Sequence, residues 1–273
     1  MPQIKDFPQK PLVSGDDKIL LQDSIDNAYK FVEVRGLGQL SKANFNRSYQ
    51  NQVLSDMPDY YFKFGEIEGN TAFDSSGFGR NAIYSNVQLN QQSLINDANN
   101  SSAYFSNEAF AAFSNIYNGS TYTNITGITV ECFVSGFNSN TPSVILHLGT
   151  HDAKSTFNGI AFELRDRKSS IHIPGINIFD SGVVINANKT HLAWTLKKNS
   201  GSNSASFSFY IDGIRRFTSS NHAVNTPSAN GYIGKIQYGD FYTGFLDELS
   251  IYGVELPDSR IYAHYKSSLL QSQ

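Results

Sequence analysis

Two adjacent carboxylates, Asp247 and Glu248, stand inside a strand-like apolar run near the end of the chain, TGFLDELSIYG. Side chains of a strand alternate between its two faces, so the pattern predicts that Asp247 shares a face with Leu249 and Ile251. A buried carboxylate without a partner is strongly unfavourable or takes up a proton. We therefore expect Asp247 to be met by hydrogen-bond donors, by a cation or by a metal ion.

Two loops combine aromatic rings with polar groups, a pattern that suits sugar binding. Aromatic faces stack on pyranose rings, while Asp, Asn and Gln side chains bond to hydroxyl groups. The alternative is that Phe241 and Tyr242 cap the core and that Tyr238 covers an apolar seam. Loops at one end of a β-sandwich cluster, so both loops are candidates for one site. The candidate ligand-binding residues are Tyr238, Asp240, Phe241, Tyr242, His151, Asp152 and Asn158.

The carboxylates and histidines do not form a catalytic pattern. Glycoside hydrolysis needs two carboxyl groups that flank one bond. Glu163 and Asp166 of FELRDR alternate onto opposite faces of a strand. His147 and His191 lie in apolar runs, where a core position is expected rather than a ligand or a base. We expect no catalytic residues, no required cofactor and no enzymatic activity.

The composition is that of a β protein with a polar, weakly charged surface. Of 273 residues, 40% are hydrophobic, 13% aromatic and 16% charged, and the formal net charge is -3. No block of Lys or Arg offers a surface for nucleic acid or for an anionic membrane. Cys132 is the single cysteine, which excludes an internal disulfide and a multi-cysteine zinc site. No signal peptide or membrane span is evident, so we expect synthesis in a cytoplasm without export by that route.

From Pro58 onward, short strand patterns recur between turn residues, which favours an antiparallel sandwich or jelly roll over βαβ units. The Asp-Gly pair at 212–213 predicts a type I′ hairpin turn. The segment ELPDSRIYAHYKSSLL predicts a C-terminal helix that begins at Pro257 and Asp258. Its apolar stripe would include Ile261, Tyr265 and Leu269.

The N-terminal part has a different texture and divides the chain into three. Residues 1–40 contain two strand-like runs, 18–22 and 28–34, that predict a small β ribbon. A two-stranded ribbon is marginal in water, so we expect it to dock on another chain or on copies of itself. Residues 41–57 predict a short helix or a solvated linker, with Phe45, Tyr49 and Val53 at helical spacing. Residues 58–273 form the sandwich.

Five segments in order make residues 58 to 268 resemble the laminin-G-like, concanavalin-A-type lectin/glucanase domains. They are YYFKFGEIEGNTAFDSSGFGRNAIY, ITVECFV, THLAWTL, FSFYIDGIRR and YIGKIQYGDFYTGFLDELSIYGVELPDSRIYAHY. The resemblance implies a two-sheet jelly roll that binds carbohydrate or protein, sometimes with a calcium ion near the start and end of the domain. Asp74, Asp247 and Glu248 fall in those motifs and are the candidate calcium ligands. The alternative is that Asp247 accepts backbone N–H bonds or pairs with Arg80.

The segment PQIKDFPQKPLVSGDDKILLQDSIDNAYKFVEVRGL resembles the opening of bacteriophage tail-fibre and other virion appendage proteins. That resemblance implies an anchor, residues 1–40, that attaches a homotrimeric fibre to other proteins of the virion. We therefore expect a non-enzymatic virion appendage, a tail fibre, spike or head fibre, whose lectin-like head binds host surface glycan. The alternative is a structural decoration protein of a phage head or baseplate. A cellular carbohydrate-binding module would need export.

Overall fold

The computed structural model describes residues 18–22, 29–33, 48–97, 99–106, 108–137, 142–151, 157–173, 177–200, 204–224, 230–236 and 239–270. The chain divides into two compact units, one up to Arg47 and one from Ser48 onward. In the first unit, β1 (Lys18–Gln22) and β2 (Tyr29–Glu33) pair antiparallel, which confirms the predicted ribbon. The proposed docking of this ribbon stays a prediction.

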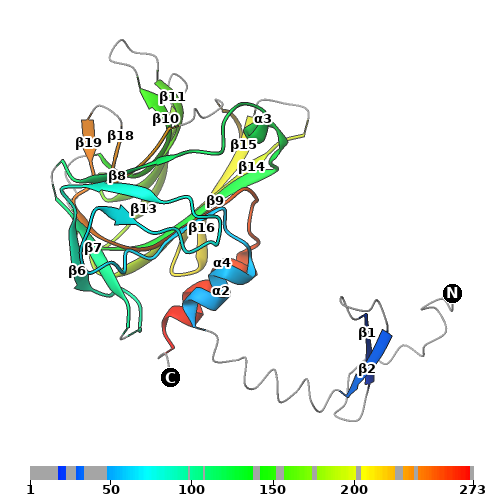
Figure 1. Ribbon diagram of the computed structural model, residues 1–273. Coiled ribbons are helices and arrows are strands. Elements are labelled where there is room, and N and C mark those ends of the chain that lie inside the picture. The colour runs from blue at the N-terminus through cyan, green and yellow to red at the C-terminus, as the bar shows by residue number, and fades with distance from the viewer. Residues whose placement is uncertain are drawn as a thin grey trace. The chain divides into compact units, whose positions relative to one another are not determined.

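The second unit is a sandwich of two sheets, as predicted (Figure 1). Within the described residues, the larger sheet has the order β13-β12-β11-β10-β17-β8-β5-β4, with β18 and β19 beside β10. All its pairings are antiparallel except that of β10 with β19. Its strands are β4 (Thr71–Ala72), β5 (Ala82–Ser85), β8 (Phe110–Ser114), β10 (Ser143–His151), β11 (Phe157–Arg165), β12 (Lys168–Ile173), β13 (Asn177–Val184), β17 (Asn230–Ile233), β18 (Lys235–Ile236) and β19 (Gly239–Phe241).

The smaller sheet has the order β16-β15-β14-β9-β20-β7-β6 in the same described part of the chain, and β3 pairs with β20. Its strands are β3 (Tyr60–Phe62), β6 (Gln88–Gln92), β7 (Ser101–Phe105), β9 (Gly127–Ser135), β14 (Thr190–Lys198), β15 (Ser204–Ile211), β16 (Ile214–Ala223) and β20 (Gly244–Tyr252). The turn between β15 and β16 is the predicted one: Asp212 and Gly213 have φ of 51° and 73°, as a type I′ turn requires.

The main core lies between the two sheets. Trp194 of β14 reaches across it to Phe162 of β11, with ring centroids 6.0 Å apart, and its indole N–H donates to Ser169 Oγ at 2.6 Å. Cys132 is buried here as a free thiol. Buried aromatic side chains of this kind remove a large apolar area from water and so contribute strongly to the stability of the core.

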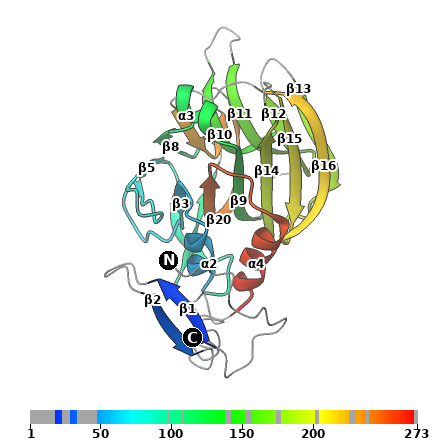
Figure 2. The same ribbon diagram turned by 90° about the vertical axis from the view of Figure 1, so that its right-hand side faces the viewer.

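Two helices cover the outer face of the smaller sheet (Figure 2). They are α2 (Tyr49–Ser55) and α4 (Asp258–Ser268). Tyr49 and Val53 of α2 are buried, so residues 49–55 form a packed helix and not a solvated linker, whereas Phe45 lies outside the described residues. Helix α4 begins where the sequence predicts, and Ile261 is buried, but Leu269 is exposed and follows the helix, contrary to the predicted stripe.

A third helix, α3 (Gly119–Asn124), connects β8 to β9. In the described part of the chain, no helix combines the length and apolarity needed to cross a membrane.

Strand β20 contains a β-bulge that overturns the predicted facing of its acids. The register of β20 with β9 shifts between Asp247 and Ser250, and Glu248 has a φ of 57°. A bulge inserts one residue, so the alternation of side chains restarts beyond it. Leu249 and Ile251 therefore face the main core with Leu246. Asp247 contacts the outer loop at Leu94 instead of sharing their face.

Candidate functional site

Asp247 and Glu248 form a fully buried acid pair beneath the loop that connects β6 to β7. Asp247 Oδ2 accepts hydrogen bonds from the Leu94 N–H at 2.7 Å and from Ser93 Oγ at 3.2 Å. The Asn100 amide donates to both acids, to Asp247 Oδ1 at 3.1 Å and to Glu248 Oε1 at 2.9 Å. The predicted acceptance of a backbone N–H by Asp247 is thus confirmed.

The alternative prediction that Asp247 pairs with Arg80 is wrong, because Arg80 pairs with Asp59 at 3.4 Å. The Tyr61 hydroxyl donates to Glu248 instead. Burial raises the pKa of Asp247 above its usual range, and burial together with the Asp247 charge raises the pKa of Glu248. Lys63 lowers both pKa values, but less than burial raises them, so the pair tends to hold a proton.

Asp74, the third proposed calcium ligand, is occupied by hydrogen bonds to nearby residues. Its carboxylate accepts bonds from the N–H groups of Tyr61, Ser76 and Arg80 at 3.0, 2.9 and 2.9 Å. Ser76 Oγ also donates to it, at 2.7 Å. Within the part of the chain that the structure describes, no three His, Cys, Asp or Glu side chains are grouped so that they could hold a metal ion. The structure therefore does not assemble the proposed calcium site from Asp74, Asp247 and Glu248.

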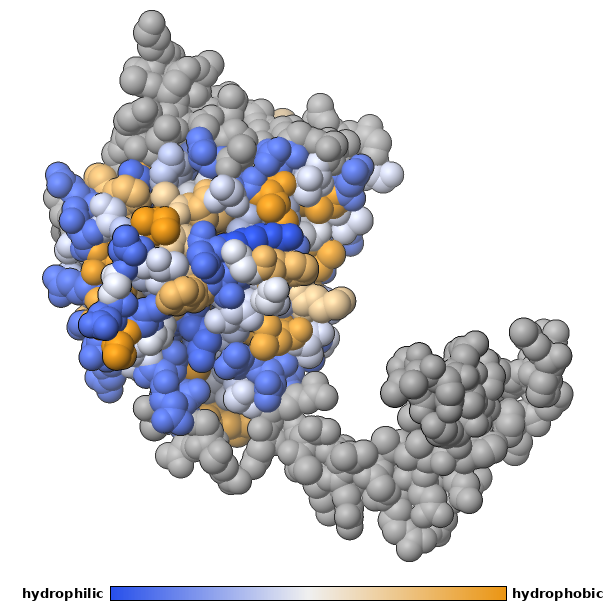
Figure 3. All heavy atoms as spheres, in the orientation of Figure 1, coloured by the Kyte–Doolittle hydropathy of each residue, from blue (hydrophilic) through white to orange (hydrophobic). Residues whose placement is uncertain are grey.

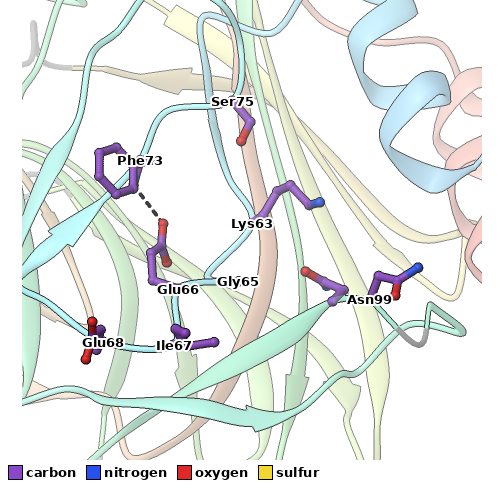
Figure 4. A pocket seen from close by; sticks show the side chains of 9 residues that line it. Lys63, Gly65, Glu66, Ile67, Glu68, Phe73, Ser75 and Asn99 are labelled. Atoms are coloured by element: carbon purple, nitrogen blue, oxygen red, sulfur yellow. Dashed lines mark hydrogen bonds between the residues drawn. The ribbon is translucent and has the colours of Figure 1, made fainter.

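An open pocket of about 460 Å³ lies beside the acid pair (Figure 4). Asn100, which bonds to both acids, is part of its lining. The pocket is formed by the segment that follows β3, by the turn after β4 and by the end of the β6–β7 loop. Its lining residues are Lys63, Gly65, Glu66, Ile67, Glu68, Phe73, Ser75, Asn99 and Asn100.

The lining of this pocket has two chemically different sides. Figure 4 shows Phe73, Glu66 and Glu68 on one side and Lys63 and Asn99 on the other. Phe73 is 59% exposed, so its ring is available for contact. Glu66 is held in place, because its Oε1 accepts from the Phe73 N–H at 2.8 Å and its Oε2 from the Tyr84 hydroxyl at 2.8 Å. An aromatic ring opposite amides and a cation suits a ligand with one apolar face and several polar groups.

The loops proposed from the sequence are not brought together at one end of β10. Phe241 of β19 pairs with Val144 near the start of β10, whereas His151 ends that strand and pairs with Phe157. At about 3.3 Å per residue, the two positions lie roughly 20 Å apart along the strand. Asn158 pairs with Thr150 near His151, and Asp152 and Tyr238 lie outside the described residues.

Of the remaining candidates, Tyr242 is buried in the core, as the alternative interpretation of that loop had it. Phe241 is half-buried and Asp240 is exposed. Asp240 lies close enough to Glu163 of β11 that its charge, after burial, helps to raise the pKa of Glu163. Glu163 is buried and paired with Arg165 at 3.0 Å, while Asp166 is exposed in the turn between β11 and β12.

Sequence reasoning missed a second buried polar cluster, which joins helix α4 to the smaller sheet. Glu131 of β9 lies 2.7 Å from His264 Nδ1, and the His191 imidazole approaches it at 3.3 Å. Tyr252 Oη and Ser250 Oγ donate to Glu131 at 2.7 and 3.1 Å. A charged residue inside the continuous apolar run ITVECFV is the signal that would have indicated it.

The charges of this cluster stabilise one another. Burial alone would raise the pKa of Glu131, but His264 and His191 hold it well below its usual range. Burial alone would lower the pKa of His264, but Glu131 and Asp56 outweigh it and raise the pKa to about 9. His264 Nε2 lies 2.9 Å from Asp56, next to α2, so the imidazolium links both helices to the sheet.

Solved structures that share this fold at low sequence identity include the following three. Domain 4 of AbnA, a GH43 extracellular arabinanase from Geobacillus stearothermophilus, solved with arabinotriose, matches at a TM-score of 0.53 and 16% identity over 76% of this chain and 98% of that domain. The binding domain of botulinum neurotoxin DC, in complex with rat synaptotagmin II, matches at a TM-score of 0.55 and 14% identity over 78% of this chain and 52% of that chain. Trypanosoma rangeli sialidase, in complex with 2,3-difluorosialic acid, matches at a TM-score of 0.53 and 14% identity over 91% of this chain and 44% of that chain. The chain thus spans about half of the latter two.

A comparison with curated proteins finds no match to the sequence. A family model, described as the concanavalin A-like lectin/glucanases superfamily, matches residues 111–262, which is more than half of the chain. The matched region includes β9, β14, β20 and the first five residues of α4, so it contains Glu131 and His191 of the buried cluster, while His264 lies just beyond it. The chain therefore belongs to the concanavalin A-like lectin/glucanase superfamily.

Proposed function

We propose that the chain is a non-enzymatic carbohydrate-binding protein and that the pocket beside the acid pair is its glycan site. The observation that carries this proposal is the exposed ring of Phe73 at one side of the pocket, with Lys63 and Asn99 on the other (Figure 4). A pyranose has an apolar face and a rim of hydroxyl groups, and such a pocket can meet both. The arabinanase domain, whose structure contains arabinotriose, is consistent with sugar binding by this fold.

The rigid backing of the pocket supports this assignment. Asn100 is fixed by its two bonds to the acid pair, and Glu66 is fixed by Phe73 and Tyr84. A site whose polar groups are already oriented loses little side-chain entropy when a ligand binds. The buried acids thus position the pocket without touching its ligand.

Phe73→Ala is expected to weaken glycan binding about tenfold or more, because it removes the stacking surface. The ligand is first identified on a glycan array, and affinities are then measured by calorimetry. Phe78→Ala is the matched control, because Phe78 lies in the same loop with 58% exposure but does not line the pocket. The control should bind as the unmodified protein does. Equal loss in both variants, or no loss in Phe73→Ala, would remove the pocket from consideration.

We further propose that this glycan-binding head belongs to a homotrimeric virion appendage attached through residues 1–40 and directed at host surface glycan. The support is the resemblance of the opening segment to tail-fibre proteins, together with the separate N-terminal unit and its ribbon. A structural decoration protein of a phage particle remains the second candidate. On the face drawn in Figure 3, described hydrophobic residues form separate small groups among hydrophilic ones. Permanent protein interfaces are more apolar than that.

The trimer is tested by the solution mass of the full chain and of a chain that starts at Ser48. The full chain is expected to have three times the monomer mass, because three ribbons can satisfy one another's open edges. The shorter chain, which keeps α2 and the whole sandwich unit, is expected to be a folded monomer. Light scattering gives both masses. A monomeric full chain would contradict the trimer and favour the decoration candidate.

A further inference from the structure

We propose that the pocket selects a positively charged amino sugar over its neutral and acidic counterparts; this inference rests on the proposed glycan-binding function. Glu66 Oε1 accepts a hydrogen bond from the Phe73 N–H at 2.8 Å, and Glu68, two residues beyond Glu66, lines the same pocket (Figure 4). An aromatic face flanked by carboxylates attracts a protonated amine through the ring quadrupole and through charge-assisted hydrogen bonds. A sugar stacked on Phe73 would place an amino substituent within this acidic side.

The carboxylates of Glu66 and Glu68 differ in their hydrogen bonds to the rest of the protein. Glu66 accepts one hydrogen bond on each oxygen, so it contributes a fixed negative charge with lone pairs to spare. Glu68 is exposed on the same side, and its carboxylate can turn toward a ligand. Glu68 is therefore the residue whose charge the ligand can engage most directly.

Lys63, the cation among the lining residues, does not cancel this preference. Its ammonium donates to Gln50 Oε1 at 3.3 Å on helix α2. Its charge also acts on Asp247 and Glu248, lowering the pKa of each. Lys63 is thus hydrogen bonded to helix α2, and its charge favours the ionised forms of the acid pair. The carboxylates on the Phe73 side have no cation of their own among the lining residues, and they repel a sialic or uronic acid.

The test uses three hexasaccharides with the same β-1,4 linkage that differ only in the substituent at carbon 2. They are the hexamers of glucosamine, N-acetylglucosamine and glucose, which carry an ammonium, an acetamide and a hydroxyl group. The titrations are run at about pH 5.5, where the amines of the glucosamine hexamer are charged. The glucosamine hexamer is expected to bind about tenfold more tightly than the other two in calorimetry. Raising the salt concentration should reduce this preference, because partly exposed charges are screened.

Glu68→Gln removes the charge with almost no change in shape. This variant is expected to lose most of the preference for the glucosamine hexamer over the glucose hexamer. Glu255→Gln is the control, because Glu255 pairs with Lys197 at 3.3 Å and does not line the pocket. It should keep the full preference. Equal affinities for the three hexamers, or a preference that survives in Glu68→Gln, would overturn the inference.

The two failures are distinguishable. If array glycans bind through the Phe73 pocket but the glucosamine hexamer shows no advantage, the charge selection is wrong and the glycan-binding function stands. If no glycan binds, or if Phe73→Ala leaves binding of every glycan unchanged, the proposed function fails and the inference falls with it.

Discussion

Glu131→Gln is expected to lower the free energy of unfolding by about 3–5 kcal/mol. The substitution keeps the shape of a fully buried side chain but removes the negative charge that His264 faces at 2.7 Å. His264 must then either stay charged in a buried site with Asp56 as its one remaining anion or give up its proton. Removal of one partner from a buried pair is costly because the other charge loses its compensation. Urea unfolding followed by tryptophan fluorescence measures the loss, since Trp194 reports on the core.

Glu255→Gln serves as the comparison, because it removes a carboxylate from an exposed ion pair with Lys197. Exposed pairs contribute about 0–1 kcal/mol, so this variant should unfold almost as the unmodified protein does. Similar losses in the two variants would show that the Glu131 cluster is no stronger than a surface contact.

Stability is expected to fall by roughly 3 kcal/mol between about pH 6.5 and pH 9. The folded-state pKa of His264 is raised to about 9 from its usual 6.5. A group with a raised pKa contributes its full stabilisation below the unfolded value and loses it as the pH rises through the folded value. The raised pKa values of Asp247, to about 7, and of Glu248 also make stability fall with rising pH, because the folded state holds their protons to higher pH; the Asp247 contribution is lost mainly between about pH 4 and pH 7.

The acid side of the profile has the opposite slope. The pKa values of Glu131 and Asp56 are lowered, so their stabilisation is present above the usual carboxyl range and disappears as the pH falls through the folded values. Stability should therefore be greatest at mildly acidic pH. Urea unfolding at a series of pH values from about 2 to 9 gives both limbs of the curve, and His264→Gln should flatten its alkaline limb. A rise in stability from neutral pH to pH 9 would contradict the assignment.

The sequence predicted those parts of the fold that depend on local pattern. The two-sheet sandwich follows from short alternating runs, the β15–β16 turn from Asp212 and Gly213, and the start of α4 from Pro257 and Asp258. The bulge in β20 could not be predicted in this way. Strict alternation assigns every side chain a face, and one inserted residue at Glu248 changes the assignment of the strand beyond it.

The pocket was missed for a different reason. Its walls come from three separate segments, and Lys63, Phe73 and Asn100 become neighbours only through the pairing of distant strands. The partnership of Glu131 with His264 likewise joins residues that are far apart in sequence. Aromatic and polar residues in loops suggested the 237–242 and 151–158 segments, but composition alone does not say which loops meet at one end of a sheet.

Helix α2 is also the first part of the sandwich unit that a pull on the N-terminal segment would load. Arg260 Nε holds Asp56 at 2.8 Å, and His264 holds both Asp56 and the Gln52 carbonyl. These contacts must rupture before tension reaches β3, which is hydrogen bonded to β20 inside the sheet. If its 7 residues unravelled, α2 would lengthen from about 10 Å to roughly 24 Å. The sandwich unit would thereby extend by more than 10 Å under tension while its sheets stayed intact.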